Sequence, residues 1–435
     1  MIVLYNILLV IAIVLGFPVL IPFVLISDKR RKTVMHRLGL TKAATGTLPR
    51  KGFYPHRKPI WIHALSVGEV LSAVPLVQGI VNSFKDRGVF VSVSTKTGFE
   101  VADQRFQDMV DAVVYYPYDL AFSVKHIAGK IDPALVVIVE SDIWPNFLFE
   151  MKKRKVPVIL ANARLSKRSF IGYKRLAVFS KSLFLSFANI CTQSAEDAER
   201  FGALGVPSSR ITVTGNIKFD QGSRALPASE IKSMRQSTHV RSSQKVLLAG
   251  STHKGEETIL LEAFTRMKKE FEDLLLIVVP RDPGRAGSVQ RIFQSARFYT
   301  VLMPELNKLA PDSRIDVIVV DAIGVLKTLY ALATVAFVGG SLVNCGGHNP
   351  LEPAVFSKPT LFGYDMSDFA EIAHMLVAEG GATRVQDAEG LYSAASKLLR
   401  NHQKAQEMGN RAFKVFNANK GAVDKTLKVI AESLF

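Results

Sequence analysis

The chain has 435 residues, of which 48% are hydrophobic and 21% charged, and these proportions exclude an intrinsically disordered protein. Its length exceeds what one hydrophobic core usually supports, so two domains are expected. The formal net charge of +17 indicates a polyanionic partner, such as nucleic acid, an anionic membrane surface or a phosphorylated substrate. The two cysteines, Cys191 and Cys345, are too few for a disulfide framework or a cysteine-ligated zinc site.

The sequence begins with an uncharged apolar segment, residues 2–26, in which Asn6 is the strongly polar side chain. At about 1.5 Å per residue, a helix of this length can cross roughly 30 Å of hydrocarbon. A cleaved signal peptide is the alternative, but no basic residues precede the run, the run is too long, and no small-residue cleavage site follows it. We therefore expect a single N-terminal transmembrane anchor over residues 1–27.

A basic run, "SDKRRKTVMHR", follows the apolar segment. The positive-inside rule places such a flank, and the chain after it, in the cytoplasm. Its lysines and arginines can also contact anionic lipid head groups, so the anionic cytoplasmic membrane surface is the expected partner. No nucleic acid partner is expected, because the sequence contains no zinc-finger spacing, basic zipper or RNP-type motif.

Short runs rich in Val and Ile then alternate with stretches of helical length. The runs of the first half are "PIWIHALS", "VFVSVST", "AVVYYP", "ALVVIVE", "VPVILANA" and "ITVTGN". Continuous apolar strands that alternate with helices are typical of a parallel sheet covered on both faces. We therefore expect a Rossmann-like α/β domain over residues 28–225.

A polar and basic segment interrupts this alternation, and we interpret residues 226–244 as a linker. The alternation resumes with "KVLLAGS", "LLLIVVP", "DVIVVD", "TVAFVGGS" and "PTLFG", which predicts a second Rossmann-like domain over residues 245–435. The expected fold class is α/β, with two doubly wound domains facing each other across a cleft. In such sheets, ligands bind at the carboxyl ends of the strands.

Polar residues follow several predicted strands of the first half. "HALSVGE" places Glu69 in the first turn of a helix, where the helix dipole alone would also favour a carboxylate. "ESDIWPN" contributes Glu140 and "GNIKFD" contributes Lys218, although either charge can also belong to a solvated surface. His63, in "HALSVGE", can be catalytic or can have a hydrogen-bonded structural role.

Polar residues also follow the strands of the second half. In "GSTHKGEE", Ser251 and Thr252 can bind a phosphate at a helix start or can cap the helix together with Glu257. "PRDPGR" carries Arg281, which can pair with a phosphate. "GGSLVNCGGHNPLEPA", residues 339–354, contains two glycine pairs that allow the backbone to approach a ligand closely.

Several common catalytic motifs are absent from the sequence. It has no G-x-x-x-x-G-K-[ST], G-x-S-x-G or H-E-x-x-H, and no G-x-G-x-x-G after the first strand. These absences disfavour a P-loop ATPase, a serine hydrolase, a zinc protease and a dinucleotide-dependent oxidoreductase. The nine histidines are scattered without a metal-ligand spacing, so neither a metal nor a cofactor is expected.

The chain carries seven such motifs in the order "HALSVGE", "ESDIWPN", "NARLSKRS", "GNIKFD", "GSTHKGEE", "PRDPGR" and "GGSLVNCGGHNPLEPA". In this order, and over nearly the whole chain, the sequence resembles the 3-deoxy-D-manno-octulosonic acid (Kdo) transferases of lipopolysaccharide synthesis. That family has the GT-B fold, with the acceptor bound mainly by the N-terminal domain and the nucleotide sugar by the C-terminal one. The resemblance implies an inverting glycosyltransferase that moves Kdo from CMP-Kdo to a lipid A precursor (lipid IVA). It also implies a location at the inner membrane, with the catalytic domains facing the cytoplasm.

The resemblance also implies roles for individual residues. Glu69 matches the general base of the family, and Glu140 and Lys218 match positions that stabilise the transition state. The family's CMP contacts and the strand ends beside them give the predicted donor site: Ser251, Thr252, Arg281, Asp282, Ile323, Gly324, Val325, Gly340, Ser341, Asn349, Pro350, Leu351 and Glu352.

The sequence departs from the family pattern on the donor side. Asp282 stands where the family usually has His, Val325 stands where it has Glu, and residues 362–369 lack the usual Pro-His and Asn. A second hypothesis is therefore a GT-B glycosyltransferase that uses another nucleotide sugar or acceptor in cell-envelope glycan synthesis. A third is a basic membrane scaffold that has kept the fold and lost the chemistry.

Overall fold

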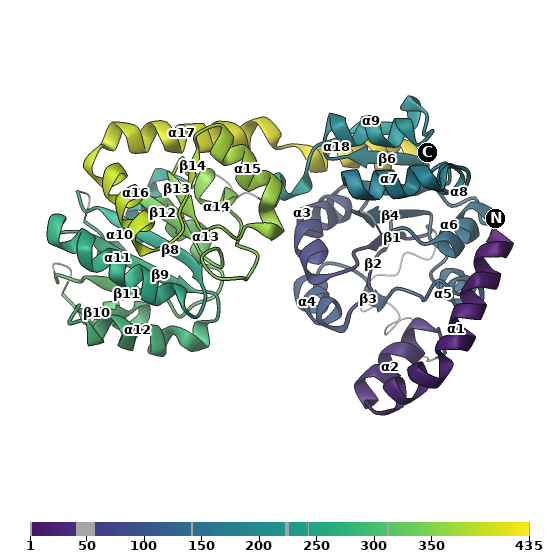
Figure 1. Ribbon diagram of the computed structural model, residues 1–435, viewed down its shortest axis with the longest axis horizontal. Helices are drawn as coiled ribbons and strands as arrows, with labels where there is room; N and C mark the ends of the chain where they lie inside the picture. Colours follow the sequence, from purple (N-terminus) through teal and green to yellow (C-terminus); the bar gives the residue numbers. More distant parts are fainter. Residues whose placement is uncertain are drawn as a thin grey trace. The chain divides into compact units, whose positions relative to one another are not determined.

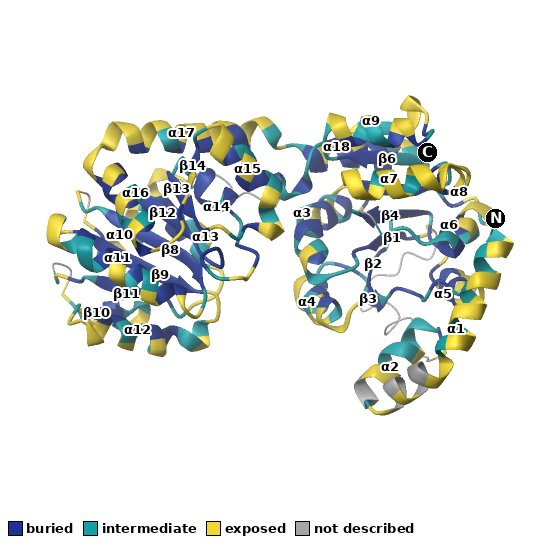
Figure 2. Cartoon of the chain, in the orientation of Figure 1, coloured by how far each residue is buried: buried dark blue, intermediate teal, exposed yellow. Residues whose placement is uncertain are grey.

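The structure is a computed structural model that describes residues 2–40, 57–140, 142–221, 226–241, 243–310 and 313–434. The chain forms two compact units (Figure 1). Unit 1 comprises Met1–Gln221 together with Lys420–Phe435, and unit 2 comprises Gly222–Asn419. Most strands of both units are buried, whereas several helices expose one side to solvent (Figure 2).

Unit 1 is built on a seven-stranded parallel sheet with the order β3-β2-β1-β4-β5-β6-β7. The apolar residues of each strand alternate between the two faces, so that Ile60 and Ile62 join one core cluster and Trp61 joins the other. The strands are β1 (Ile60–His63), β2 (Val89–Val93), β3 (Ala112–Tyr115), β4 (Leu135–Val139), β5 (Val158–Ala163), β6 (Asn189–Thr192) and β7 (Ile211–Val213).

Helices cover both faces of this sheet, as the continuous apolar strands predict. One face is covered by α3 (Val67–Ser83), α4 (Lys96–Phe106) and α18 (Ala422–Leu434). The other is covered by α5 (Ala121–Ile131), α6 (Pro145–Lys153), α7 (Lys167–Arg175), α8 (Ala177–Phe184) and α9 (Ala195–Ala203).

The unit boundaries differ from the predicted domains, because the C-terminal helix α18 belongs to unit 1. The Asp220 carboxylate, in the short helix η3 (Ile217–Gln221), accepts hydrogen bonds from the amides of Gly421 and Val423 at 2.6 and 2.7 Å. The apolar side of α18 then packs against α3 in the core of unit 1. The predicted second domain over residues 245–435 is therefore corrected by the return of residues 420–435 to unit 1.

The segment predicted as a linker contains helix α10 (Ala228–Ser237) and belongs to unit 2. Ile231 and Met234 lie three residues apart on this helix and pack against a core cluster of unit 2. The many polar residues around them hid this narrow apolar side in the sequence.

Unit 2 has its own seven-stranded parallel sheet, with the order β10-β11-β9-β8-β12-β13-β14. The strands are β8 (Val246–Thr252), β9 (Leu275–Pro280), β10 (Thr300–Leu302), β11 (Val317–Val319), β12 (Val335–Val338), β13 (Thr360–Phe362) and β14 (Ala382–Arg384). In addition to α10, the helices of unit 2 are α11 (Glu256–Glu270), α12 (Ala286–Ser295), α13 (Leu326–Leu329), α14 (Leu351–Ala354), α15 (Ala370–Ala378), α16 (Ala388–Arg400) and α17 (His402–Asn419).

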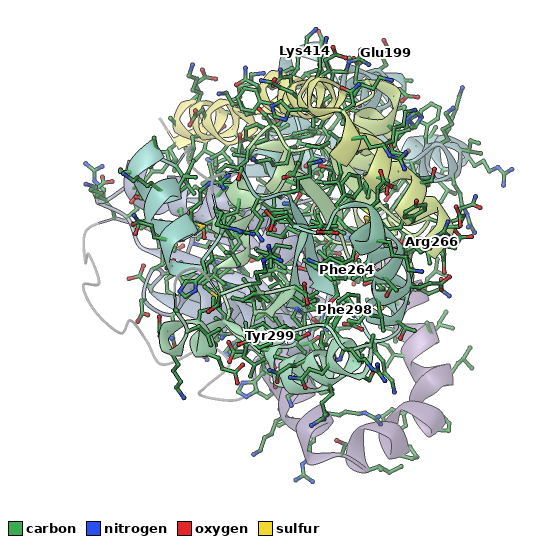
Figure 3. The ribbon with its side chains drawn as sticks, turned by 90° about the vertical axis from the view of Figure 1, so that its left-hand side faces the viewer. Glu199, Phe264, Arg266, Phe298, Tyr299 and Lys414 are labelled. Atoms are coloured by element: carbon green, nitrogen blue, oxygen red, sulfur yellow. The ribbon has the colours of Figure 1, made fainter. Side chains whose placement is uncertain are left out.

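Helix α11 shows how the unit 2 helices divide between core and solvent. Phe264 points inward and packs against Phe298, with 5.0 Å between the ring centroids (Figure 3). Arg266, two residues further along, instead lies at the surface over the ring of Tyr392. The apolar positions of the helix thus determine which side faces the sheet.

Helices α1 (Ile2–Leu25) and α2 (Asp28–Arg37) precede the sheet of unit 1. Among the described residues, no helix is both long and apolar enough to cross a membrane, so the predicted transmembrane helix over residues 1–27 is not supported. The start of α1 is hydrogen-bonded to other segments of unit 1. Tyr5 donates a hydrogen bond to Asp119 at 2.9 Å, and the Asn6 amide bonds to that of Asn146 at 2.8–2.9 Å.

Candidate active site

Glu69 lies in the first turn of α3, directly after the loop that follows β1. Its carboxylate accepts a hydrogen bond from the amide of Leu65. Burial, and then the neighbouring carboxylates of Glu140 and Asp142, raise the pKa of Glu69 to about 8. A carboxyl group with a pKa near neutral pH is suited to accept a proton during a reaction.

Glu140 follows β4 and has a backbone φ of +66°, in the left-handed region. This conformation costs a non-glycine residue about 1–2 kcal/mol. Burial raises the pKa of Glu140, and the positive charges of Lys218 and Arg164 oppose that rise. Because Glu140 interacts with both Glu69 and Lys218, the structure brings the three predicted catalytic residues together within unit 1.

A hydrogen-bonded network holds the backbone around Lys218. Asn162, at the end of β5, accepts from the Ile217 amide at 3.0 Å, and its carbonyl accepts from Gln193 at 2.9 Å. Gln193 in turn accepts from the Asn216 side chain at 3.0 Å, and Asn216 accepts from the Lys218 amide at 2.9 Å. Sequence reasoning missed Asn162 and Gln193, although each is a polar residue at or just after a strand end.

His63, at the end of β1, is fully buried and lies in a hydrogen-bonded network. Its Nε2 lies 2.7 Å from Asp142 Oδ2, and its Nδ1 lies 3.0 Å from Ser92 Oγ. Its ring stacks on Tyr116 with 3.7 Å between centroids. Both ring nitrogens therefore have partners, and His63 holds Asp142 where it raises the pKa of Glu69.

The coupling between the two glutamates leads to a prediction for the pH profile. Glu140→Gln removes a negative charge beside Glu69, so the pKa of Glu69 falls. A general base acts when it is deprotonated, so with Glu69 as the predicted base, kcat/KM is expected to rise with pH through the pKa of this carboxyl group. We expect this rise to occur at lower pH in the variant than in the parent. An unchanged midpoint in the kcat/KM profile would contradict the coupling.

In unit 2, the buried carboxylate of Glu256 at the start of α11 organises the chain after β8 and β12. It accepts hydrogen bonds from the amides of His253, Gly340, Ser341 and Leu342 at 2.9, 2.7, 3.0 and 2.9 Å. The amides of Gly340 and Ser341, two residues of the predicted donor site, are thus bonded to a carboxylate of the protein. Their role in the structure is to fix the loop after β12.

Two hydroxyl groups of the predicted donor site, those of Thr252 and Ser341, also form hydrogen bonds within the protein. Thr252 donates to Glu257 at 2.9 Å, and Glu257 pairs with Arg285 at 3.0 Å. Ser341 donates to the carbonyl of Val338 at 2.6 Å. Of the two alternatives for Thr252, the structure therefore shows the hydrogen bond to Glu257. The remaining strand-end residue, Ser251, is buried and has a φ of +56°.

The second glycine pair of "GGSLVNCGGHNPLEPA" packs closely against another segment of unit 2, residues 365–368. Gly346 and Gly347 have φ values of +79° and +71°. A Cβ at Gly347 would lie 2.4 Å from the sulfur of Met366, and one at Gly346 would lie 2.7 Å from the Asp368 carboxylate. Glycine is therefore required for packing against residues 365–368. The close backbone approach that the sequence predicts for this pair is therefore seen toward another segment of the protein.

A charged cluster forms around Arg281, which follows β9. Burial raises the pKa of Glu352, and Lys327 and Arg281 oppose the rise. Burial, followed by Arg281 and His253, lowers the pKa of His348 to about 4. The Nε2 atoms of His253 and His348 lie 2.9 Å apart. The cluster thus contains Arg281 and Glu352 of the predicted donor site, together with three residues outside that site: His253, Lys327 and His348.

Asp282 and Asn349 both act as turn-capping residues. Asp282 accepts a hydrogen bond from the Gly284 amide at 2.9 Å, at the start of a short 3₁₀ helix. Asn349 accepts from the Leu351 amide at 3.0 Å, where α14 begins immediately after Pro350. The departure from the family at Asp282 therefore introduces a carboxylate that bonds to its own loop.

Residues 323–325 form the turn that precedes α13. Gly324 has a φ of +88°, and the Ile323 side chain is 81% exposed. Lys327, on the helix that Val325 begins, interacts with Glu352, so this turn leads into the charged cluster.

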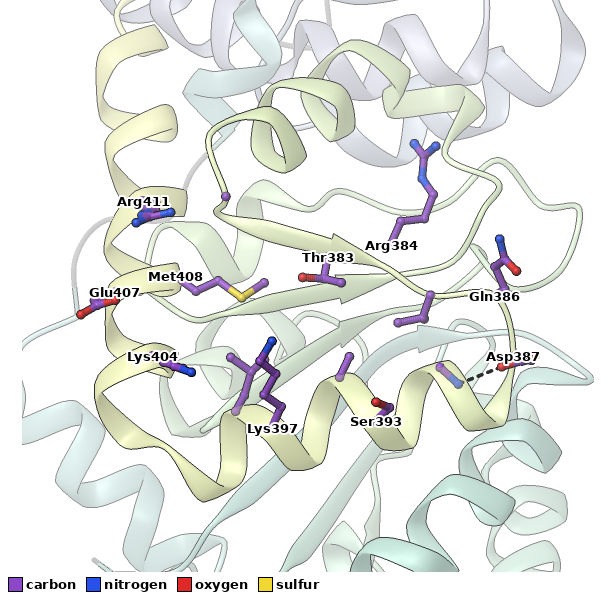
Figure 4. Close-up of a pocket in the computed structure, with 15 residues that line it drawn as sticks. Thr383, Arg384, Gln386, Asp387, Ser393, Lys397, Lys404, Glu407, Met408 and Arg411 are labelled. Carbon is purple, nitrogen blue, oxygen red and sulfur yellow. Dashed lines mark hydrogen bonds between the residues drawn. The ribbon is translucent and has the colours of Figure 1, made fainter.

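A pocket of about 700 Å³ lies elsewhere in unit 2, beside β14, α16 and α17 (Figure 4). Arg384, Lys397, Lys404 and Arg411 contribute positive charge to its lining, and Asp387 and Glu407 contribute negative charge. It contains none of the predicted site residues. Within the ranges that the structure describes, no group of three or more His, Cys, Asp or Glu residues is placed to hold a metal ion.

Comparison with known proteins identifies the family. A family model described as 3-deoxy-D-manno-octulosonic-acid transferase (kdotransferase) matches residues 32–221. The 3-deoxy-D-manno-octulosonic acid transferase of Haemophilus influenzae is 34% identical over 387 residues, which cover 88% of this chain and 90% of that protein. The chain belongs to the Kdo transferase family. The Kdo transferase of Chlamydia pneumoniae is 30% identical over 429 residues, covering 98% of this chain and 95% of its own.

A solved structure supports the fold of this Kdo transferase family member. The UDP-GlcNAc 2-epimerase of Neisseria meningitidis, solved with UDP-GlcNAc bound, matches with a TM-score of 0.56 at 14% identity. The match covers 86% of this chain and 99% of the epimerase. The predicted family and the two parallel-sheet α/β domains, which resemble those of GT-B glycosyltransferases, are therefore confirmed.

Proposed function

We propose that this chain transfers Kdo from CMP-Kdo to a lipid A precursor, with inversion at the anomeric carbon, in lipopolysaccharide synthesis. The observation that carries the proposal is the association of Glu69, Glu140 and Lys218 at the strand ends of unit 1 in a member of the Kdo transferase family. A buried carboxyl with a raised pKa beside a second acid and a lysine has no evident packing value.

In the proposed reaction, the ionised carboxylate of Glu69 takes the proton of an acceptor sugar hydroxyl. The hydroxyl oxygen forms a bond to the anomeric carbon of Kdo, while the bond from that carbon to the CMP phosphate oxygen breaks. The electron pair of the broken bond leaves with CMP. Lys218 offsets the negative charge that develops in the transition state, and Glu140 holds Lys218 through their electrostatic attraction.

We assign donor binding to the charged cluster of unit 2. Arg281 and Lys327 are the cations that interact with buried Glu352, and they are suited to contact the phosphate of CMP. The Glu352 carboxylate is suited to accept hydrogen bonds from the ribose hydroxyls.

The proposed location is the cytoplasmic side of the inner membrane. Helix α1 exposes many large apolar side chains: Val3, Leu4, Ile7, Leu8, Val10, Ile11, Val14, Leu15 and Phe17. The basic helix α2 follows directly. An apolar helix beside a basic one favours contact with an anionic lipid surface, where a lipid acceptor carrying phosphates would be found.

The assignment of Arg281 predicts a loss of nucleotide affinity in Arg281→Gln. Removal of one charge-assisted hydrogen bond should weaken CMP binding by about 10- to 100-fold. Isothermal titration with CMP measures this change. Arg291→Gln, at an exposed position on α12, is the matched control and should bind CMP as the parent does. Equal affinities in both variants would remove Arg281 from the donor site.

The identity of the nucleotide separates the proposal from its alternative. Asp282 and Val325 depart from the family pattern and favour a GT-B enzyme with another nucleotide sugar. Thermal unfolding with CMP, UDP and GDP distinguishes the two, because a ligand that binds the folded state raises the unfolding temperature. We expect stabilisation by CMP. Stabilisation by UDP or GDP, but not by CMP, would favour the alternative.

A further inference from the structure

The pocket beside β14, α16 and α17 has no role in the proposed transfer, yet it gathers positive charge from all three elements. Arg384 comes from β14, Lys397 from α16, and Lys404 and Arg411 from α17. Against these four cations stand two carboxylates, so the lining has a formal net charge of +2. A concave site lined mainly by one sign of charge concentrates ions of the opposite sign.

The four cationic side chains have no partner in the part of the chain that the structure describes. None of them forms an ion pair or a hydrogen bond there, whereas Arg400, also on α16, pairs with Glu270. Glu407 lies three residues after Lys404 on α17, but its carboxylate accepts a hydrogen bond from Gln403 at 3.1 Å. Like charges that converge without a counter-charge repel one another, so the pocket favours the binding of an anion.

Three of the cations lie away from the other carboxylate of the pocket. Lys404 and Arg411 are seven residues apart, so they share one side of α17 and are separated by about 10 Å along its axis. Figure 4 shows Lys397 rising from α16 into the space between this helix and β14. Asp387 caps the start of α16, ten residues before Lys397 and therefore about 15 Å away along the helix. An anion can contact the three cations without approaching Asp387.

The turn before β14 packs directly against Arg411. Gly380, in this turn, has a φ of +68°, and a Cβ at this position would lie 2.8 Å from Arg411 Nη1. The guanidinium group is thus in contact with the backbone at the wall of the pocket, while its hydrogen-bond donors stay unpaired within the described residues. Such a group loses little conformational freedom when it binds a ligand.

The rest of the lining suits a sugar better than a nucleobase. Val385 and Leu398 belong to the core of unit 2 and give the pocket an apolar wall. Among the described residues that line the pocket, none is aromatic, so a base has no ring on which to stack. Hydroxyl and amide groups that can bond to sugar hydroxyls come from three exposed side chains: Thr383, Gln386 and Ser393.

We propose that this pocket is a second ligand site of unit 2, separate from the charged cluster around Arg281, and that it binds a sugar carrying two phosphate groups. Lys397 and Lys404 bind one phosphate and Arg411 binds the other, with the sugar ring between them. The same chemistry occurs in a free sugar bisphosphate and in the head group of a phosphorylated glycolipid. The inference does not depend on the transfer reaction.

Isothermal titration of the full chain with glucose 1,6-bisphosphate tests the site. Lys404→Gln with Arg411→Gln should weaken binding by about 10- to 100-fold, the range for loss of a charge-assisted hydrogen bond. Arg291→Gln with Lys414→Gln is the matched control, because it removes the same charge from exposed positions on α12 and α17 outside the pocket. The control should bind as the parent does. In the parent, the ligand should also slow hydrogen exchange within residues 383–411.

Both double variants change exposed side chains, so both should unfold at the parental temperature without ligand. Titration with a tetraacyl disaccharide bisphosphate dispersed in detergent then identifies the source of the ligand. A lipid that binds more tightly than the free sugar, with this advantage lost in Lys404→Gln with Arg411→Gln, identifies a head group. A response of the pocket variant to the free sugar alone identifies a soluble ligand.

Four results would overturn the proposal. The first is a parent chain that does not bind glucose 1,6-bisphosphate, and the second is equal affinity in the pocket variant and its control. The third is binding that is lost in Arg281→Gln but kept in the pocket variant, which would place the ligand in the charged cluster around Arg281. The fourth is equally tight binding of inorganic phosphate, which would show that the sugar is not recognised.

Discussion

Glu69→Gln is expected to lower kcat by about 10²- to 10⁴-fold, the usual contribution of a general base. The amide of Gln keeps the size and hydrogen-bonding ability of the side chain but cannot accept the proton of the acceptor hydroxyl. Affinity for CMP should be unchanged, because the proposed nucleotide contacts lie in unit 2. Single-turnover transfer measures the chemical step, and a variant with parental turnover would remove Glu69 as the base.

The same substitution should change the dependence of stability on pH. The pKa of Glu69 is about 8 in the folded chain, compared with the ordinary value of 4.5. Between these values the folded state retains a proton that the unfolded state has lost, so the contribution of Glu69 to stability falls as pH rises. Glu69→Gln should therefore unfold at a higher temperature than the parent at pH 8, with the difference vanishing below pH 4.5. Thermal unfolding at both ends of this range tests the pKa independently of activity.

Glu256→Ala is expected to destabilise unit 2 by about 4 kcal/mol or more, because it leaves buried amides without their acceptor. The carboxylate accepts four backbone hydrogen bonds, three of them from residues 340–342. Urea unfolding followed by circular dichroism gives the total loss, and hydrogen exchange at residues 340–342 locates it.

Glu262→Ala is the matched control, because Glu262 lies on the same helix and is exposed. Its effect should be within about 0.5 kcal/mol, as is usual for surface substitutions. A loss below about 1 kcal/mol in Glu256→Ala, with exchange at residues 340–342 unchanged, would show that the loop after β12 does not depend on this carboxylate.

The cluster of predicted catalytic residues in unit 1 could be predicted because the carboxyl ends of parallel strands meet at one edge of a sheet. Glu69 follows β1, Glu140 follows β4 and Lys218 follows β7, and these strands share the sheet of unit 1. The pattern of apolar runs therefore sufficed to place the three residues in one region. It could not reveal Asn162 and Gln193 as the support for Lys218, since their bonds depend on a backbone φ of +56° at Asn162.

The donor side was harder to predict, because a polar residue at a strand end can bond to a ligand or to its own protein. Glu256 has the sequence position of an ordinary first-turn carboxylate, yet it is fully buried and accepts hydrogen bonds from the amides of Gly340 and Ser341. Likewise, the amphipathic pattern of α18 shows that one side must be buried but not which unit buries it. Such long-range choices depend on tertiary packing.

The central claim is tested most directly by transfer itself. The full chain is incubated with CMP-Kdo and a tetraacyl disaccharide bisphosphate, and the acceptor is examined by mass spectrometry, with Glu69→Gln in parallel. The account predicts an acceptor whose mass rises by one or more Kdo residues, with CMP released, and almost no such product from the variant. An acceptor that remains unmodified with CMP-Kdo but gains a sugar from another nucleotide donor would contradict it.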